Sequence, residues 1–144
     1  METATMGKVL VTAKLENHQD LYMVKQKMLD PTKVRSIEVA DAVVDTERTL
    51  LSVPTHLIEK LGLTRFKNRP IRTNTGVVQT HIYGVVQLTI QGRDCVMDVA
   101  EVPDDCPVLI GRIPLLALDW VVDPIGQKLV GNPEHGGEWM IEQF

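Results

Sequence analysis

The sequence predicts a mainly β protein with short helices, folded as one domain over residues 1–144. Apolar and polar residues alternate in several short segments, which is the pattern of strands with one buried face. Glycine, proline and asparagine separate these segments at short intervals, as turns between strands require. This combination is typical of an all-β barrel or a β-sandwich, and the periodicity alone leaves both open.

Composition restricts the classes of function. The chain has 144 residues, of which 44% are hydrophobic and 24% charged, as in ordinary globular proteins. Its net charge of −4 argues against a nucleic-acid partner, because phosphate binding needs clustered Lys and Arg. No apolar run is as long as a membrane span, and residues 1–6 are polar, so we expect no membrane partner and no secretory signal. Two cysteines, Cys95 and Cys106, make no disulfide framework, so we expect a reduced, cytoplasmic protein.

Periodicity and turn residues assign the elements. The predicted strands are residues 7–15, 36–44, 84–90, 93–102, 108–110, 120–123 and 128–130, with a further hairpin over 70–83. The predicted helices are residues 20–29, 54–61 and 113–118. Asp20 is expected to cap the first helix and Pro31 to stop it. The turn of the 70–83 hairpin is expected at Asn74-Thr75-Gly76.

Two segments carry a family resemblance. The apolar pair Val43-Val44 is followed by Asp45-Thr46, and further along the chain comes Val108-Leu109-Ile110-Gly111-Arg112. Together they resemble the two signature segments of the retropepsin-like aspartic peptidases, the family of the retroviral proteases and their bacterial and cellular relatives. The hairpin with Gly76 at its tip lies between them, where that family has its flap. The resemblance covers about residues 7–130 and leaves residues 131–144 as a C-terminal tail.

The resemblance implies a closed β-barrel of the acid protease type, with one lobe per chain. It also implies an aspartic endopeptidase that needs neither a cofactor nor a metal ion. The residues it assigns are Asp45 as the catalytic carboxylate, Thr46 as a hydrogen-bonding partner across a dimer axis, Thr75, Gly76 and Val77 as the flap over the substrate, and Ile110 and Gly111 as the support beneath the catalytic loop.

Aspartic peptidases use two carboxylates that share one proton across a bound water molecule. One Asp45 per chain therefore implies a homodimer, with an extended peptide or protein as substrate. Val121-Val122-Asp123 repeats the Val43-Val44-Asp45 pattern. Because Asp123 is followed by Pro124, we interpret it as a turn residue rather than a second catalytic group.

Glu47 stands where the family has glycine, and three interpretations of this difference stay open. The loop turns Glu47 outward and weak cleavage survives, or the protein is a pseudo-peptidase that binds a peptide or a partner protein, or Glu47 was introduced on purpose or arose in one copy. In a dimer, two Asp45 and two Glu47 near one axis would repel and should bind protons or cations, with Arg48 neutralising part of the charge. We favour impaired or absent cleavage over full activity.

Other candidate sites are weaker. The histidines are scattered at His18, His56, His81 and His135 without metal-binding spacing, so we predict no metal site. His135 is expected to be a solvated loop residue. Cys106, in a loop beside proline, is open to two interpretations, a nucleophile or an unreactive thiol, and we favour the second. Trp120 and Trp139 are interpreted as anchors of the core or of an interface.

Overall fold

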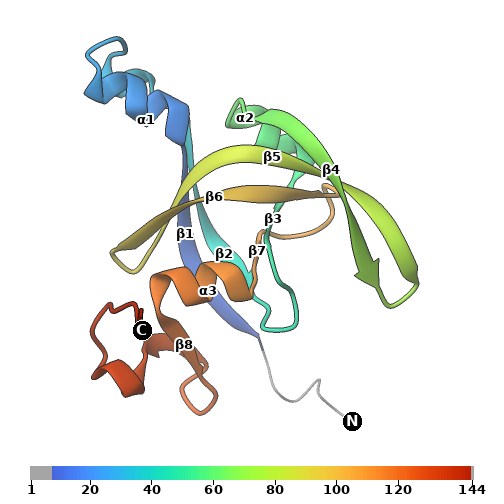
Figure 1. Ribbon diagram of the computed structural model, residues 1–144, viewed down its shortest axis with the longest axis vertical. Coiled ribbons are helices and arrows are strands. Elements are labelled where there is room, and N and C mark those ends of the chain that lie inside the picture. Colours follow the sequence, from blue (N-terminus) through green and yellow to red (C-terminus); the bar gives the residue numbers. More distant parts are fainter. Residues whose placement is uncertain (1–7, 144) are drawn as a thin grey trace.

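The computed structural model describes residues 8–143 and shows a mainly β protein with short helices (Figure 1). Its centre is a closed barrel of six strands in mixed parallel and antiparallel pairing. The barrel decides between the two architectures that the periodicity left open. Residues 1–7 and 144 lie outside the described residues, and with them the polar N-terminal segment, the start of the strand expected from residue 7 and the end of the tail.

The strands are β1 (Val9–Asn17), β2 (Ser36–Val44), β3 (Leu51–Pro54), β4 (Thr64–Thr73), β5 (Gly76–Ile90), β6 (Arg93–Val102), β7 (Leu109–Ile110), β8 (Trp120–Asp123) and β9 (Lys128–Gly131). The helices are α1 (His18–Lys25), α2 (Thr55–Lys60) and α3 (Arg112–Leu118), with 3-10 turns η2 (Pro31–Lys33) and η3 (Pro133–His135). The predicted strand 84–90 is the second half of β5, and each of the other predicted strands and helices has a counterpart whose ends differ by a few residues. The prediction missed β3 and began the β4–β5 hairpin too late.

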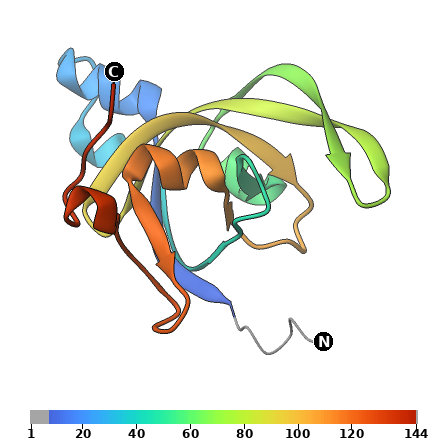
Figure 2. The same cartoon turned by 60° about the horizontal axis from the view of Figure 1, so that its bottom comes forward.

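The barrel follows the strand order β1-β2-β7-β3-β6-β5, and pairing of β1 with β5 closes it. The pairs β2–β7 and β3–β6 are parallel, and the remaining barrel pairs are antiparallel. Within the described chain β4 pairs only with β5, so it lies outside the barrel. The β4–β5 hairpin projects from the body of the molecule in both views (Figures 1 and 2).

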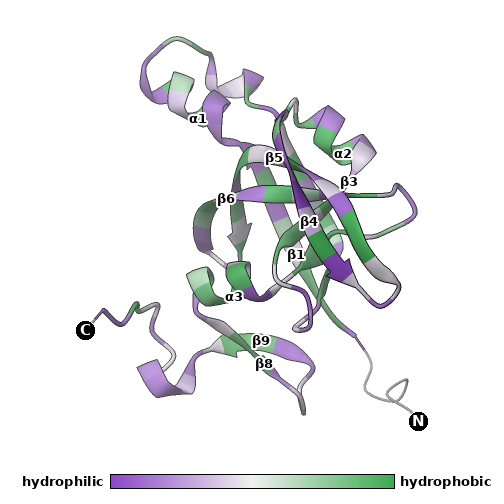
Figure 3. Ribbon diagram, turned by 45° about the vertical axis from the view of Figure 1, so that its right-hand side comes forward, coloured by the Kyte–Doolittle hydropathy of each residue, from purple (hydrophilic) through white to green (hydrophobic). Residues whose placement is uncertain are grey.

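The core is formed by apolar side chains that alternate along the barrel strands, visible as alternating bands in Figure 3. On β1, Val11, Ala13 and Leu15 are buried while the residues between them are exposed or half-buried. In contrast, all four residues of β3 are buried, so this inner strand has no alternation. A short apolar segment without alternation does not identify a strand, which is why the sequence did not predict β3.

The prediction that Asp20 caps α1 is wrong. Asn17 is the cap, and its side chain accepts a hydrogen bond of 3.0 Å from the backbone N–H of Asp20. The buried Asp20 carboxylate instead accepts from Nε and Nη2 of Arg35, at 2.8 and 2.9 Å, and from the Arg35 backbone N–H. These hydrogen bonds from Arg35 hold the pKa of Asp20 below its usual range. The pair joins α1 to the segment that enters β2.

Helix α1 lies far from the end of β2 that carries Asp45. Strands β1 and β2 are antiparallel, with Val9 opposite Val44 and Glu16 opposite Ser36. Because α1 follows β1 directly, it lies at the Ser36 end of this pair and contacts β1 and β5 (Figure 1). The helical segment therefore covers the end of the β1–β2 pair opposite to Asp45.

We predict that Asp20→Asn lowers the free energy of unfolding at neutral pH by about 1–3 kcal/mol, since it removes a charged hydrogen-bond acceptor. The pKa of Asp20 is lowered in the folded state, so its contribution is present above the unfolded pKa and is lost as pH falls through the folded value. Urea unfolding at pH 7 and pH 3 measures this difference. The control Asp41→Asn changes an exposed carboxylate and should have little effect. An Asp20→Asn loss that is equal at both pH values would contradict the prediction.

Candidate functional site

Asp45 follows the last residue of β2 and opens a tight turn. Its backbone N–H donates to the Ile110 carbonyl oxygen at 2.9 Å, which continues the pairing of β2 with β7. The Arg48 N–H donates to the Asp45 carbonyl oxygen at 3.2 Å, and the Glu47 N–H donates to Asp45 Oδ1 at 3.0 Å. Strand pairing and the turn together fix both the backbone and one carboxylate oxygen of Asp45.

Arg48 lies against the other carboxylate oxygen. Its Nε is 3.3 Å from Asp45 Oδ2, and the side chains of Arg48 and Asp45 are 47% and 34% exposed. At this exposure water screens the attraction, so the ion pair adds little stability. It does place a positive charge beside Asp45, as the sequence analysis expected for Arg48.

Gly111 passes directly beneath the loop of residues 45–50. A Cβ atom at Gly111 would overlap the Leu50 carbonyl oxygen and lie 2.8 Å from the Thr49 carbonyl carbon. Next to it, the backbone N–H groups of Arg112 and Ile113 donate to the carbonyl oxygens of Arg48 and Thr49, both at 2.9 Å. The structure thus brings Ile110 and Gly111 together with the loop that begins at Asp45.

Arg112 is a positioning residue that the sequence analysis did not identify. Its Nη2 donates to Thr49 Oγ1 at 2.9 Å and its Nη1 to the Thr46 carbonyl oxygen at 3.4 Å. Arg112 is also the first residue of α3, so the helix is attached to the loop by both backbone and side chain. Its place immediately after Gly111 was the available sequence signal.

Thr46 and Glu47 form the exposed tip of the loop. Among residues 8–143, neither side chain makes a hydrogen bond or an ion pair. The backbone of Glu47 does not have a positive φ, so a side chain at this position causes no strain of the kind that glycine relieves. The cost of Glu47 is therefore its charge and bulk rather than its backbone conformation.

A groove of about 660 Å³ separates this loop from the projecting hairpin, a volume within the usual range of ligand sites. The residues that line the groove are Asp45, Glu47, Arg48, Thr49 and Leu50 from the loop, Arg69 to Asn74 from the hairpin, and Ser52, Ala100 and Ile113 between them. Thr75, Gly76 and Val77 lie at the hairpin tip and do not line it. The hairpin wall comes from the β4 side of the turn, from residues 69–74, which directly precede the expected residues 75–77.

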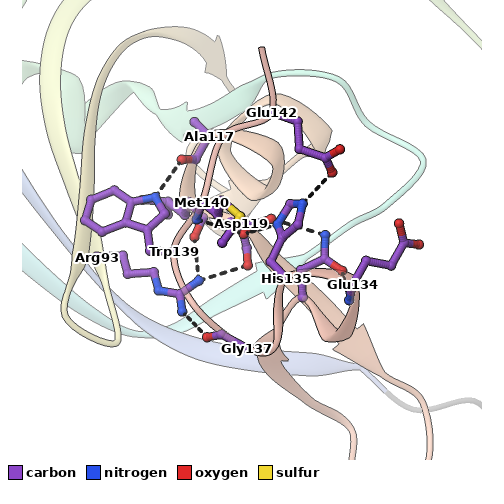
Figure 4. Close-up of polar contacts among 11 residues, drawn as sticks. Arg93, Ala117, Asp119, Glu134, His135, Gly137, Trp139, Met140 and Glu142 are labelled. Atoms are coloured by element: carbon purple, nitrogen blue, oxygen red, sulfur yellow. Dashed lines mark hydrogen bonds and ion pairs between the residues drawn. The ribbon is translucent and has the colours of Figure 1, made fainter. Parts of the chain in front are cut away.

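A second polar cluster shows that the prediction for His135 is wrong (Figure 4). The His135 side chain is only 10% exposed, with Nδ1 2.6 Å from Asp119 Oδ2 and Nε2 2.6 Å from Glu142 Oε2. Since both ring nitrogens face carboxylates, the ring is best satisfied when both carry a proton. These contacts raise the pKa of His135, and His135 in turn lowers the pKa of Asp119.

The same cluster fastens the C-terminal tail to the body of its own chain. Asp119 also accepts from the Met140 N–H at 3.1 Å, and Trp139 Nε1 donates to the Ala117 carbonyl oxygen at 3.2 Å. Arg93 donates to the carbonyl oxygens of Asp119 and Gly137 at 2.9 and 2.7 Å (Figure 4). Among residues 8–143, no hydroxyl or thiol makes a hydrogen bond with the side chain of His135 or Asp119.

The remaining candidate residues lie apart from the groove and from the His135 cluster. Residues 8–143 contain no group of three or more His, Cys, Asp or Glu side chains placed to hold a metal ion. Cys95 and Cys106 are free thiols, and burial, with Asp94 nearby, raises the pKa of Cys95 to about 11. Asp123 is the last residue of β8, at the start of the β8–β9 turn, and its Oδ1 accepts from the Ile125 N–H at 3.1 Å. Across residues 8–143, no helix has both the length and the apolar character that crossing a membrane requires.

Comparison with models of known protein families finds no match, and comparison with curated proteins finds none either.

We predict that Gly111→Ala lowers the free energy of unfolding by about 1–3 kcal/mol, because backbone atoms of the loop must move to admit the new methyl group. Urea unfolding measures the loss. The matched control is Leu116→Ala in helix α3, because Leu116 is 80% exposed. Its free energy of unfolding should stay within about 0.5 kcal/mol of the parent value. Equal stability of Gly111→Ala and the parent would show that the loop is not packed as described.

The tail cluster should make stability depend on pH through His135. The pKa of His135 is raised on folding, so its charged form stabilises the folded state. This stabilisation is fully present below the ordinary pKa of about 6.5 and is lost as pH rises through the pKa of the folded state. Because the pKa of Asp119 is lowered in the folded state, Asp119 stays charged and keeps its interaction with His135 in acidic solution until pH falls through that lowered pKa. We therefore expect His135→Gln to be least stable, relative to the parent, in mildly acidic solution.

Urea unfolding midpoints measured from pH 5 to pH 9 test this. The difference between the parent and His135→Gln should shrink steadily as pH rises. Glu142→Gln, which removes the more exposed of the two carboxylates, should give a smaller loss with the same trend. A difference that does not change with pH would refute the assignment of a charged His135.

Proposed function

We propose that this protein is a retropepsin-like aspartic endopeptidase that acts as a homodimer, with Asp45 of each chain forming the catalytic pair. One observation carries the proposal. Asp45 ends a barrel strand, its backbone is bonded to Ile110, and Gly111 passes beneath its loop with no room for a side chain. This is the arrangement that the two signature segments imply. It is formed by residues 45–50 and 110–113, which are far apart in the sequence.

The chemistry follows from two carboxylates in contact. Like charges repel strongly at short distance, so two carboxylates in contact share one proton. One carboxylate takes a proton from a water molecule while the other donates to the carbonyl oxygen of the scissile peptide bond. The Glu47 N–H donates to Asp45 Oδ1, Arg48 Nε lies beside Oδ2, and Asp45 lines the groove.

The need for a second chain is supported by what the groove lacks. Asp45 and Glu47 are its carboxylates, and Asp123 belongs to the β8–β9 turn instead. The Thr46 hydroxyl is exposed and without a partner among residues 8–143, so it is free to bond across a two-fold axis. A symmetric dimer supplies the second carboxylate with no further element.

An extended peptide fits the groove between the loop and β4. Strand β4 pairs with β5 on one side only, so its other edge has main-chain donors and acceptors to offer. Peptides bind such edges by adding a strand, with main-chain hydrogen bonds giving affinity and side-chain contacts giving selectivity. Glu47 lines the same groove and adds charge near the pair, so we propose an enzyme of reduced activity.

The second candidate function is a pseudo-peptidase that binds a peptide or a partner protein without cleaving it. The observation that favours it is the position of Glu47, whose side chain shares the groove with Asp45. In a dimer, four carboxylates would then compete for protons near one axis.

Cleavage of an unfolded protein substrate from acidic to neutral pH tests the proposal. We expect slow cleavage by the parent chain, none by Asp45→Asn, and up to about a hundredfold faster cleavage by Glu47→Gly, since small displacements in a catalytic site have costs of that size. Asp41→Asn, which changes an exposed carboxylate on the same strand outside the groove, should cleave like the parent.

Each outcome decides between the two candidates. Cleavage by Glu47→Gly alone would make the parent a silenced peptidase and favour the binding function. If no chain cuts more than Asp45→Asn, or if sedimentation shows a monomer at every concentration tested, the peptidase proposal fails.

A further inference from the structure

The groove carries an excess of positive charge on an acidic protein. The whole chain has a net charge of −4, yet the charged residues that line the groove are Arg48, Arg69 and Arg72 against Asp45 and Glu47. Arg48 is already paired with Asp45. The charge that remains for a ligand to meet therefore comes from Arg69 and Arg72, opposed by Glu47.

Arg69 and Arg72 differ from the other arginines because their guanidinium groups are not used. In the described part of the chain neither makes a hydrogen bond or an ion pair. The remaining arginines contact a partner: Arg35 binds Asp20, Arg48 binds Asp45, Arg65 binds His81, Arg93 binds Asp119 and Gly137, and Arg112 binds Thr49. An unpaired guanidinium offers several donors in a planar fork that matches a carboxylate.

The two arginines lie along the free edge of β4. Residues 69–74 line the groove consecutively, so the groove follows the edge of the strand rather than one of its faces. Side chains alternate between the faces of a strand, so Arg69 and Arg72, three positions apart, extend to opposite faces. A peptide strand paired with this edge would have one arginine beside each of its own two faces.

We propose that the groove selects extended peptide segments with two acidic side chains three residues apart. The inference rests on the proposed function for the identity of the groove as the peptide site. Spacing of three places the two acidic groups on opposite faces of the added strand, at the separation of Arg69 and Arg72. Each acidic group can then accept a bidentate hydrogen bond from one guanidinium.

Glu47 acts against this selection. Its carboxylate lines the same groove without a partner among residues 8–143, so it repels an acidic ligand. For an acidic peptide to be preferred, its attraction to Arg69 and Arg72 must therefore be stronger than its repulsion by Glu47. It follows that Glu47→Gln should bind acidic peptides more tightly than the parent does, while its affinity for a neutral peptide changes little.

The test measures the binding of labelled ten-residue peptides to the whole Asp45→Asn chain by fluorescence anisotropy. This variant keeps the groove but cannot cut the peptides. One peptide carries Glu-x-x-Glu, a twin carries Gln-x-x-Gln, and a third carries Glu-x-x-x-Glu, which puts both acids on one face. At low salt we expect the first to bind about tenfold more tightly than its neutral twin, with the third between them. High salt should remove most of the preference.

Arginine variants made in the same chain connect the preference to the groove. Arg69→Gln and Arg72→Gln should each remove most of the preference for Glu-x-x-Glu and leave binding of the neutral twin unchanged. Arg65→Gln, which removes an arginine from the same strand outside the groove, is the matched control and should keep the preference. Circular dichroism of each variant checks that the hairpin is folded.

The inference is overturned if the acidic peptide and its twin bind equally, or if Arg65→Gln acts like the groove variants. It is also overturned if Arg69→Gln and Arg72→Gln weaken both peptides equally, since they would then support the hairpin rather than select a ligand. If binding is charge-selective but neither the parent nor Glu47→Gly cuts, the peptidase proposal is refuted and the inference about the groove stands. Cleavage without charge preference would refute the inference alone.

Discussion

The close passage of Gly111 under residues 48–50 is the constraint on which the site depends. It lets β7 lie between β2 and β3, with the Asp45 N–H bonded to Ile110 and the Arg112 and Ile113 N–H groups bonded to the loop. A side chain at this point would push the loop away from the barrel and move Asp45 with it. The catalytic geometry that we propose is therefore a consequence of backbone packing, and little of it rests on the exposed ion pair with Arg48.

The two walls of the groove have different support. The loop wall belongs to the closed barrel, where each strand has neighbours on both sides. The hairpin wall belongs to β4, which has one neighbour and exposed residues along nearly its whole length. A strand held on one side opens at lower cost than one inside a barrel, so motion between the walls is expected to come from the hairpin.

The sequence predicts features that depend on a local pattern and does not predict features that depend on contacts between distant segments. Strands with one buried face, such as β1, repeat every second residue and were predicted. The approach of Gly111 to the loop of residues 45–50 has no such repeat, and its expectation came from the family resemblance. Strand β3 is buried on both faces and has no such repeat. The cap of α1 was assigned to Asp20 because the apolar helical spacing begins at Leu21, but the helix begins at His18 and its cap is Asn17. The Asp20 side chain binds Arg35 instead. The partners of His135 come from separate segments, so no local pattern could identify them.

Helix α3 gives the C-terminal tail a connection to the loop. Its first residue, Arg112, is bonded to the loop of residues 46–49, and its far end at Asp119 is held by His135 and Met140 of the tail. At 1.5 Å per residue this helix is only about 10 Å long. An affinity tag, a fusion partner or a proteolytic cut near residue 140 therefore acts on the same short helix that supports Asp45, and a change made at the end of the chain is not remote from its groove.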